Sequence, residues 1–285
     1  MITVMKKNRQ TNVISFPFEL FGRTGTAEGA EWMLDCLKEI VDDAVEEDTP
    51  ARSKAYRDSV SWDEVNFTDF ATAQSWRELA NEVLSSSLND NETLLWFGGN
   101  HLSVLPIYDY LQESDLILQW DAHLDIQEFS DNLTTLNHGN FLLSRQTPCA
   151  PIINLGHRDL LLPPKKVQKH FNKAYSIMAI LGKENQVLEE LQPFLKKSNR
   201  IWIDIDGDVF DPTFFPGVNY PLPFGISPQI FLQFLNVIDF TKVCGISISE
   251  FNPARDRYDL SAGLLAWLLE YILIRWHESP LSSSS

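Results

Sequence analysis

The sequence has few cysteines and no pattern that would pair them. Cys36, Cys149 and Cys244 lie far apart and form no CxxC motif. An odd and scattered set is typical of a chain that stays reduced and has no disulfide framework. The first ten residues include basic groups but no apolar stretch follows them, so we expect no secretory signal and a cytoplasmic protein.

Basic residues are also scarce. There are 23 lysines and arginines against 39 aspartates and glutamates, which gives a formal net charge of -16. A nucleic-acid partner requires a basic face, so this balance argues against one. An acidic surface suits a cationic substrate, although it also simply keeps a protein soluble. The sequence does not decide the oligomeric state.

Long uninterrupted apolar runs are absent as well. The most apolar stretch, residues 260–276, contains Glu270 and falls short of a clean membrane span. We therefore predict a buried C-terminal helix there and no membrane partner. No Pro/Gly/Ser-rich linker divides the chain, which predicts one domain over residues 1–285. The serine-rich residues 280–285 are expected to form a disordered tail.

What the sequence does contain is a series of short apolar segments separated by stretches with helical spacing. The predicted strands are residues 11–18, 93–97, 116–120, 151–155, 174–180, 200–205 and 243–248. Helices are predicted over residues 27–45 and 69–88, and the acidic segment 42–52 is expected to be a solvated loop. Continuous apolar strands that alternate with helices predict an α/β fold, with a mostly parallel sheet covered on both faces.

Polar motifs follow several of these strands directly. They are Gly98-Gly99-Asn100-His101, Asp121-Ala122-His123-Leu124-Asp125, Asp206-Gly207-Asp208 and Glu250-Phe251-Asn252-Pro253. In parallel α/β sheets the active site lies beyond the carboxyl ends of the strands. A single DxD or a single GGNH is usually a turn or a surface feature. Their joint occurrence at strand ends indicates a site.

The spacing within these motifs favours a metal centre. Residues two apart on an extended chain point the same way, so Asp121, His123 and Asp125 can converge. Asp204, Asp206 and Asp208 repeat this spacing on another strand. Converging carboxylates repel one another and need cations. Oxygen ligands with one or two imidazoles suit Mn²⁺ among other divalent ions, and two ions roughly 3.5 to 4 Å apart would neutralise the cluster.

The motifs in this order resemble the ureohydrolase superfamily of arginases and agmatinases, whose usual forms are GGDH, DAHxD, HG, DxDxxDP and ExNP. The forms in this chain are GGNH, DAHLD, NHGNF, DGDVFDP and SEFNP, between Gly98 and Pro253. The resemblance implies a three-layer α/β/α fold with a mostly parallel central sheet and two manganese ions. It also implies a hydrolase that cleaves C–N bonds in linear amidines such as guanidino groups.

Carried over residue by residue, the resemblance assigns the ligands. One ion would take His101, Asp121, Asp125 and Asp206, and the other His123, Asp121, Asp206 and Asp208, so that Asp121 and Asp206 bridge. Asp125 would also hold the attacking water and pass a proton to the leaving amine. His138 resembles the family's proton shuttle, and Glu250 would pair with the guanidinium. Asp204 is interpreted as an acid behind the ligands, and Asp211-Pro212 as structural.

The chain departs from arginases around the substrate. Asn100 replaces an aspartate. The loop over residues 126–137 offers Gln127, Asn132 and Thr134 where arginases hold the substrate carboxylate. In the family's GxRDxD segment, which supplies acids near the α-amino group, the first acid is kept as Asp159 and the second is replaced by Leu161. Asn132, Thr134, Asp159 and Glu250 remain the candidate substrate contacts.

An altered amino-acid end favours a substrate whose α-groups are already amides, because unpaired buried charges are costly. This resembles the peptide arginases, which convert arginine side chains of ribosomally made peptides to ornithine, with release of urea. The alternative is a small-molecule ureohydrolase of the agmatinase, arginase or formimidoylglutamase kind. A non-catalytic metal-binding member is disfavoured because every ligand position is filled. A phosphatase or deacetylase is disfavoured by the SEFNP motif.

Overall fold

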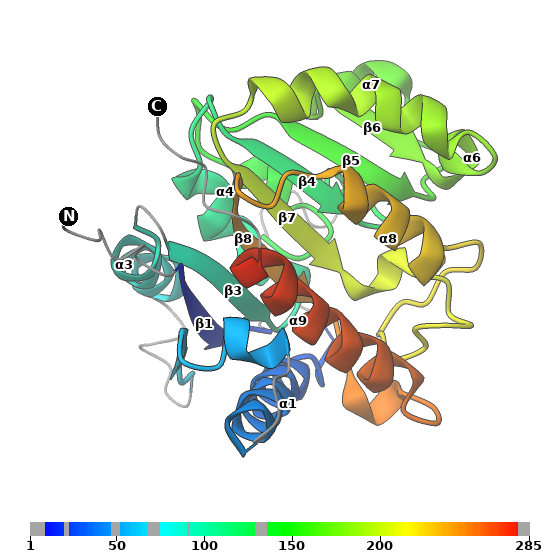
Figure 1. Cartoon of the computed structure of the whole chain (residues 1–285). Coiled ribbons are helices and arrows are strands. Elements are labelled where there is room, and N and C mark those ends of the chain that lie inside the picture. Colours follow the sequence, from blue (N-terminus) through cyan, green and yellow to red (C-terminus); the bar gives the residue numbers. More distant parts are fainter. Residues whose placement is uncertain are drawn as a thin grey trace.

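The fold is built on an eight-stranded sheet in which every neighbouring pair of strands is parallel (Figure 1). The computed structural model describes residues 9–19, 23–46, 52–67, 75–89, 92–128 and 136–278. The strand order is β2-β1-β3-β8-β7-β4-β5-β6. The strands are β1 (Gln10–Phe16), β2 (Val60–Glu64), β3 (Glu92–Gly98), β4 (Leu116–Trp120), β5 (Ile152–His157), β6 (Lys173–Ser176), β7 (Ile201–Asp206) and β8 (Val243–Ser249).

The central strands are mostly apolar because both of their faces are covered. Along β3, Leu95 and Phe97 pack into one apolar cluster, whereas Leu94 and Trp96 pack into the cluster on the other face. All of β4, β7 and β8 is buried in the same way, while the edge strand β2 is mostly exposed. The sheet is therefore the middle layer of three.

The helices form the two outer layers. Buried residues of α1 (Ala27–Glu46), α6 (Ile177–Ile180), α7 (Glu184–Lys197), α8 (Pro228–Val237) and α9 (Leu260–Glu278) pack on one face, where α9 crosses in front of the central strands in Figure 1. Residues of α3 (Trp76–Ser87), α4 (Leu105–Tyr110) and α5 (Pro164–His170) pack on the other. Short 3₁₀ turns are η1 (Arg52–Ala55), η2 (His101–Val104), η3 (Phe141–Ser144), η4 (Gly207–Val209) and η5 (Pro253–Arg255). The predicted three-layer α/β/α fold is confirmed.

Most predicted strands are confirmed, and two segments are corrected. Residues 174–180 were expected to form one strand, but the strand ends at Ser176, whose side chain accepts a hydrogen bond from Ala179 N and begins α6. The acidic loop expected over 42–52 is wrong for residues 42–46, which complete α1. Residues 47–51, the start of the helix predicted from 69, and the tail 280–285 lie outside the described residues.

None of the helices in the described part of the chain has the length and apolar character needed to cross a bilayer. The buried helix predicted over residues 260–276 is α9, and seven of its residues are buried: Ser261, Leu265, Leu268, Leu269, Ile272, Leu273 and Trp276. It packs on the sheet and on α1 rather than standing apart from the domain.

Candidate metal centre

The four polar motifs lie at the carboxyl ends of four adjacent strands. In sheet order these strands are β3, β8, β7 and β4. His101 lies just beyond β3, Glu250 just beyond β8, Asp206 ends β7 and Asp121 follows β4. Segments more than a hundred residues apart in sequence therefore meet at one edge of the sheet, as the carboxyl-end rule predicts.

The double glycine before His101 is required by a close backbone approach. A Cβ atom on Gly99 would lie 2.4 Å from the carbonyl oxygen of Phe18. That same oxygen accepts a hydrogen bond from Asn100 N at 3.0 Å. Only glycine allows the turn after β3 to pass so near the end of β1. The turn then places the His101 side chain over the strand ends.

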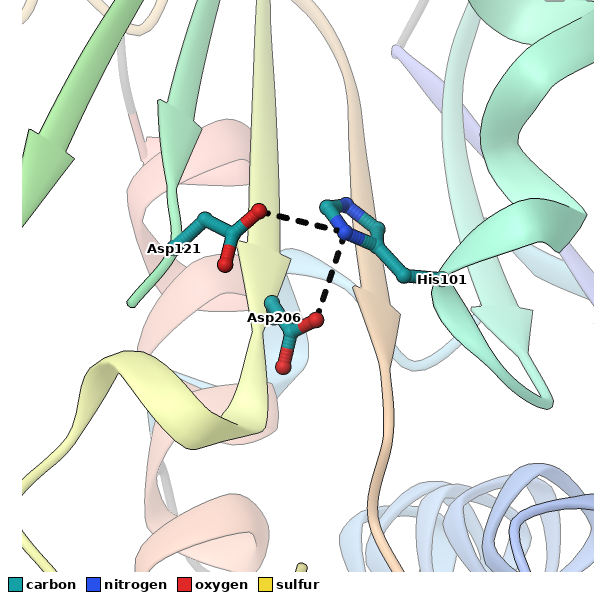
Figure 2. A group of neighbouring side chains, drawn as sticks. All are labelled: His101, Asp121 and Asp206. Atoms are coloured by element: carbon teal, nitrogen blue, oxygen red, sulfur yellow. Dashed lines mark ion pairs between the residues drawn. The ribbon is translucent and has the colours of Figure 1, made fainter. Parts of the chain in front are cut away.

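His101 stands at the centre of a buried group of carboxylates (Figure 2). Its Nδ1 lies 2.8 Å from Asp125 Oδ2, 3.2 Å from Asp206 Oδ2 and 3.3 Å from Asp121 Oδ2. One ligand atom each from His101, Asp121 and Asp206 lie within 4.8 Å of one another. These three residues are spaced so that they could hold one metal ion.

A second group lies beside the first. His123 Nδ1 is 2.8 Å from Asp208 Oδ2 and 3.8 Å from Asp121 Oδ1. Ligand atoms of Asp121, His123 and Asp208 again lie within 4.8 Å of one another. Unlike His101, the half-buried His123 side chain keeps 31 % of its surface exposed, so the second group lies nearer the solvent.

Asp121 belongs to both groups, with its two oxygens directed to different histidines. This is the arrangement expected of a bridging carboxylate. Asp206 was also expected to bridge. The described geometry groups it with His101, and its Oδ1 accepts a hydrogen bond from Asp208 N at 2.9 Å. Asp125 contacts His101 directly, while Asp208 contacts His123.

The site concentrates negative charge in a buried place. The five predicted functional carboxylates are at most 5 % exposed: Asp121, Asp125, Asp206, Asp208 and Glu250. Burial, followed by the charge of Asp125, raises the pKa of Asp121 to about 7. Burial and the charge of Asp208 raise the pKa of Asp206 well above its ordinary value. Such a cluster is stable in its ionised form only beside cations.

At the two histidines the surroundings favour the charged form instead. Burial opposes protonation of His101, but the charges of Asp204 and Asp121 outweigh it and raise its pKa well above the ordinary value. The charge of Asp208 outweighs burial and raises the pKa of His123 to about 10. Each imidazole therefore lies where positive charge is favoured.

One atom in particular is suited to bind a cation. Asp121 Oδ2 is buried and accepts no hydrogen bond from the described part of the chain, although His101 Nδ1 is 3.3 Å away. A buried carboxylate oxygen without a hydrogen bond is costly. The residue set of imidazoles and carboxylates, together with this oxygen, fits divalent metal ions.

Asp125 and Glu250 share an unusual backbone conformation. Their φ angles are 46° and 65°, in the left-handed region that side-chain-bearing residues rarely adopt. Glu250 Oε1 accepts a hydrogen bond from His101 N at 2.8 Å, and Glu250 N donates to Gly99 O at 2.9 Å. Backbone strain of this kind is often found at functional sites. Here it turns two predicted functional carboxylates towards His101.

His138 lies in a turn close to the segment after Asp125, since Gly139 O accepts a hydrogen bond from Gln127 N. Its ring stacks on Tyr220, with centroids 5.6 Å apart and planes inclined by 28°. The guanidinium of Arg23 lies 4.6 Å from the centroid of the same tyrosine ring. Sequence reasoning missed Tyr220 and Arg23, because neither belongs to a motif.

Arg158 was also missed as a functional residue, although it lies in the GHRD segment. Its guanidinium donates to the carbonyl oxygens of Asp208 and Val209, at 2.9 Å in the second case. It thereby holds η4, which carries Asp208. Burial lowers the pKa of Arg158, against the opposing charges of Asp208 and Asp121. An arginine directly after an apolar strand is the sequence signal that could have identified it.

The other candidate substrate contacts are Asp159, Asn132 and Thr134. Asp159 Oδ1 accepts hydrogen bonds from Leu161 N and Leu162 N, so this carboxylate shapes its own loop. Asn132 and Thr134 lie outside the described residues. Asp211 accepts hydrogen bonds from Thr213 N and Gly225 N and orders the loop after β7, in keeping with a structural role.

Comparison with known proteins identifies related sequences and folds. The family model for the arginase family matches residues 9–274. A formimidoylglutamase of Clostridium tetani is 26% identical over 179 residues, 59% of this chain and 53% of that protein. Arginase 1, mitochondrial, of Oryza sativa subsp. indica is 28% identical over 178 residues, 60% of this chain and 52% of that protein. The chain thus spans about half the length of these two relatives.

The solved structure of arginase from Bacillus subtilis has a similar fold. It superposes with a TM-score of 0.74 over 93% of this chain and 98% of that chain, at 20% sequence identity. At this identity the likeness concerns the fold.

Proposed function

The chain belongs to the arginase family, and from that premise we propose that it is a two-metal hydrolase of guanidino or amidino C–N bonds. The observation that carries the proposal is the pair of ligand groups, His101-Asp121-Asp206 and Asp121-His123-Asp208, which share one buried carboxylate. Mn²⁺ is the proposed metal, because carboxylates with one imidazole per ion suit it. When bound, two such ions supply a nucleophile from water near neutral pH and neutralise developing charge.

Glu250 is proposed to bind the cationic end of the substrate. Its carboxylate is 5 % exposed, and burial raises its pKa to about 8. A guanidinium beside it would favour the ionised carboxylate and form charge-assisted hydrogen bonds. Because Glu250 also accepts a hydrogen bond from His101 N, a substrate bound to it would be positioned next to the ligand groups.

Asp125 and His138 are proposed to move protons. Asp125 is buried in contact with His101, so it can accept the proton of the attacking water and deliver it to the leaving nitrogen. His138 is stacked on Tyr220 in the turn at residues 138–140, where it can exchange that proton with solvent.

The substrate is proposed to be an arginine side chain within a peptide, which would yield ornithine and urea. Leu160 and Leu161, beyond β5, are 89% and 91% exposed, so they offer an apolar surface at the edge that carries the site. Asp159 already accepts two backbone hydrogen bonds. These features suit a peptide better than a free α-amino group, which needs a charged partner.

Arg23 favours a second candidate, a small substrate that carries a carboxylate, as formimidoylglutamate does. The exposed Arg23 guanidinium lies over Tyr220, which in turn stacks on His138. A cation in this place could pair with a substrate carboxylate. The C. tetani relative is named formimidoylglutamase, which is consistent with this alternative.

A comparison of substrates tests the proposal. Values of kcat/KM are measured at saturating Mn²⁺ for an arginine-containing peptide, free arginine, agmatine and formimidoylglutamate, with Asp206→Asn as the inactive control. We expect the peptide to be turned over fastest, with Arg23→Ala nearly neutral. Faster turnover of formimidoylglutamate that is lost in Arg23→Ala would establish the second candidate. Equal or better turnover of free arginine or agmatine would reject the peptide while keeping the hydrolase.

A further inference from the structure

A fully buried carboxylate lies behind the ligand groups, in contact with His101. Asp204 is on β7, two residues before Asp206, and its side chain has no exposed surface. Residues two apart on a strand lie on the same face, so Asp204 is one step deeper than Asp206 on the same side of the sheet. A buried carboxylate in such a position requires donors for its oxygens.

Both oxygens of Asp204 have hydrogen-bond donors beside them. Asp204 Oδ2 accepts a hydrogen bond from Tyr108 OH at 2.6 Å and lies 2.9 Å from His101 Nε2. Asp204 Oδ1 accepts from Ser247 Oγ at 2.5 Å. Ser247 Oγ in turn accepts from Trp202 Nε1 at 2.9 Å. The direction of these two hydrogen bonds is fixed, because the indole N–H of Trp202 can only donate and the Ser247 hydroxyl donates its proton to Asp204.

The network determines which nitrogen of His101 carries a proton. An ionised carboxylate only accepts hydrogen bonds, so the contact with Asp204 requires a proton on Nε2. Nδ1 is then the nitrogen directed at the space between Asp121 and Asp206, where the ligand group lies and where a metal ion would replace its proton. Phe141 packs edge-on against the His101 ring, with centroids 5.0 Å apart, and so restricts its rotation.

We infer that Asp204 is a positioning residue that holds His101 with Nε2 protonated and Nδ1 directed at the metal centre. The inference rests on the metal centre proposed above. Tyr108 and Ser247 orient Asp204, and Asp204 orients the ligand. Partners of this kind behind a histidine ligand raise its basicity and fix its tautomer, and their loss typically costs about 10- to 100-fold in metal affinity.

The test is a Mn²⁺ titration of metal-free wild type and of Asp204→Asn, followed by the electron paramagnetic resonance signal of unbound Mn²⁺. The substitution keeps the shape of the side chain but removes its charge. We expect one of the two ions, the one that takes His101, to bind about 10- to 100-fold more weakly. The second ion, which takes His123, should change less.

The control is Ile203→Val, a buried change on the opposite face of the same strand that should leave both affinities unchanged. Tyr108→Phe and Ser247→Ala relax the carboxylate without removing it, so they should weaken the same ion by smaller factors. These two variants decide the question if Asp204→Asn does not fold.

The outcomes separate the inference from the metal centre itself. A wild type that fails to bind two ions would reject the centre. A wild type that binds two ions, with unchanged affinities in Asp204→Asn, Tyr108→Phe and Ser247→Ala, would reject the role of Asp204. Equal weakening of both ions in Asp204→Asn would likewise overturn a role that acts through His101.

Discussion

Asp206→Asn is expected to affect stability in opposite directions with and without metal. Asp206 is 3 % exposed and lies among other buried carboxylates. Without metal the buried charge of this carboxylate destabilises the folded state, whereas with metal the carboxylate is a ligand. The change also keeps the hydrogen bond that Asp206 Oδ1 accepts from Asp208 N, since an amide oxygen can accept it equally.

The magnitude in the metal-free protein follows from the distances. With an effective dielectric constant of about 20, attraction to His101 at 3.2 Å is about 5 kcal/mol. Repulsion from Asp121, whose ligand oxygen lies within 4.8 Å, is at least about 3.5 kcal/mol. The attraction to His101 is therefore larger than the repulsion from Asp121. Burial and the further charges of Asp208 and Glu250 outweigh this difference, because the pKa of Asp206 is raised well above its ordinary value. Asp206→Asn should therefore stabilise the metal-free protein by on the order of 1 kcal/mol.

In the presence of metal the order reverses. An ion at 100 times its dissociation constant stabilises the folded state by about 2.7 kcal/mol. For a domain of this size that corresponds to a rise in Tm of roughly 5–10 °C. Asp206→Asn should lose most of this rise because one of the two ligand groups loses a charged oxygen.

The assay is thermal or urea denaturation in EDTA and again in excess Mn²⁺. Glu189→Gln, an exposed acid on α7, is the matched control for the loss of one negative charge and should behave as wild type in both conditions. The reasoning is refuted if Asp206→Asn is less stable than wild type in EDTA, or if it keeps the full Mn²⁺-induced rise in Tm.

Three further predictions concern His138, Glu250 and His277. His138→Ala should leave both ions bound and lower kcat by about two to four orders of magnitude, as expected for a general acid or base; metal loss on titration would reassign the residue. Glu250→Ala should keep the ions and raise KM for guanidino substrates, and an unchanged KM would contradict its role as the cation anchor. Burial and then the charge of Arg9 lower the pKa of His277 to about 4, below its ordinary 6.5. The unfolded chain thus takes up a proton that the folded state resists, so the free energy of unfolding should fall as the pH drops from 6.5 towards 4. Urea titrations across this range should show a smaller fall for His277→Gln, and an equal fall would argue against this linkage.

The sheet could be predicted because its central strands are apolar on both faces. The segments that became β3, β4, β7 and β8 are mostly apolar and have polar motifs at or directly after their ends. β2 could not be predicted, because Val60–Glu64 is a short, polar edge strand that is mostly exposed. Its place in the sheet depends on pairing with β1, a contact that local periodicity does not encode.

The two candidate ligand groups could be predicted to the level of residues because each motif is local in sequence. Their surroundings could not. Tyr108 and Ser247 reach Asp204 from α4 and β8, about a hundred and about forty residues away in sequence. Tyr220 meets His138 across a similarly long separation. Such partners are set by the tertiary arrangement of strands and loops, and no spacing rule identifies them.

The central claim is that two metal ions, held by the two ligand groups, carry out hydrolysis of a guanidino or amidino C–N bond. The most direct measurement is a titration of Mn²⁺ into metal-free protein, in which bound ions per chain and product release are determined on the same samples. The account predicts two ions per chain and activity that rises as the second ion binds. Saturation at one ion, or full activity in the metal-free protein, would contradict it.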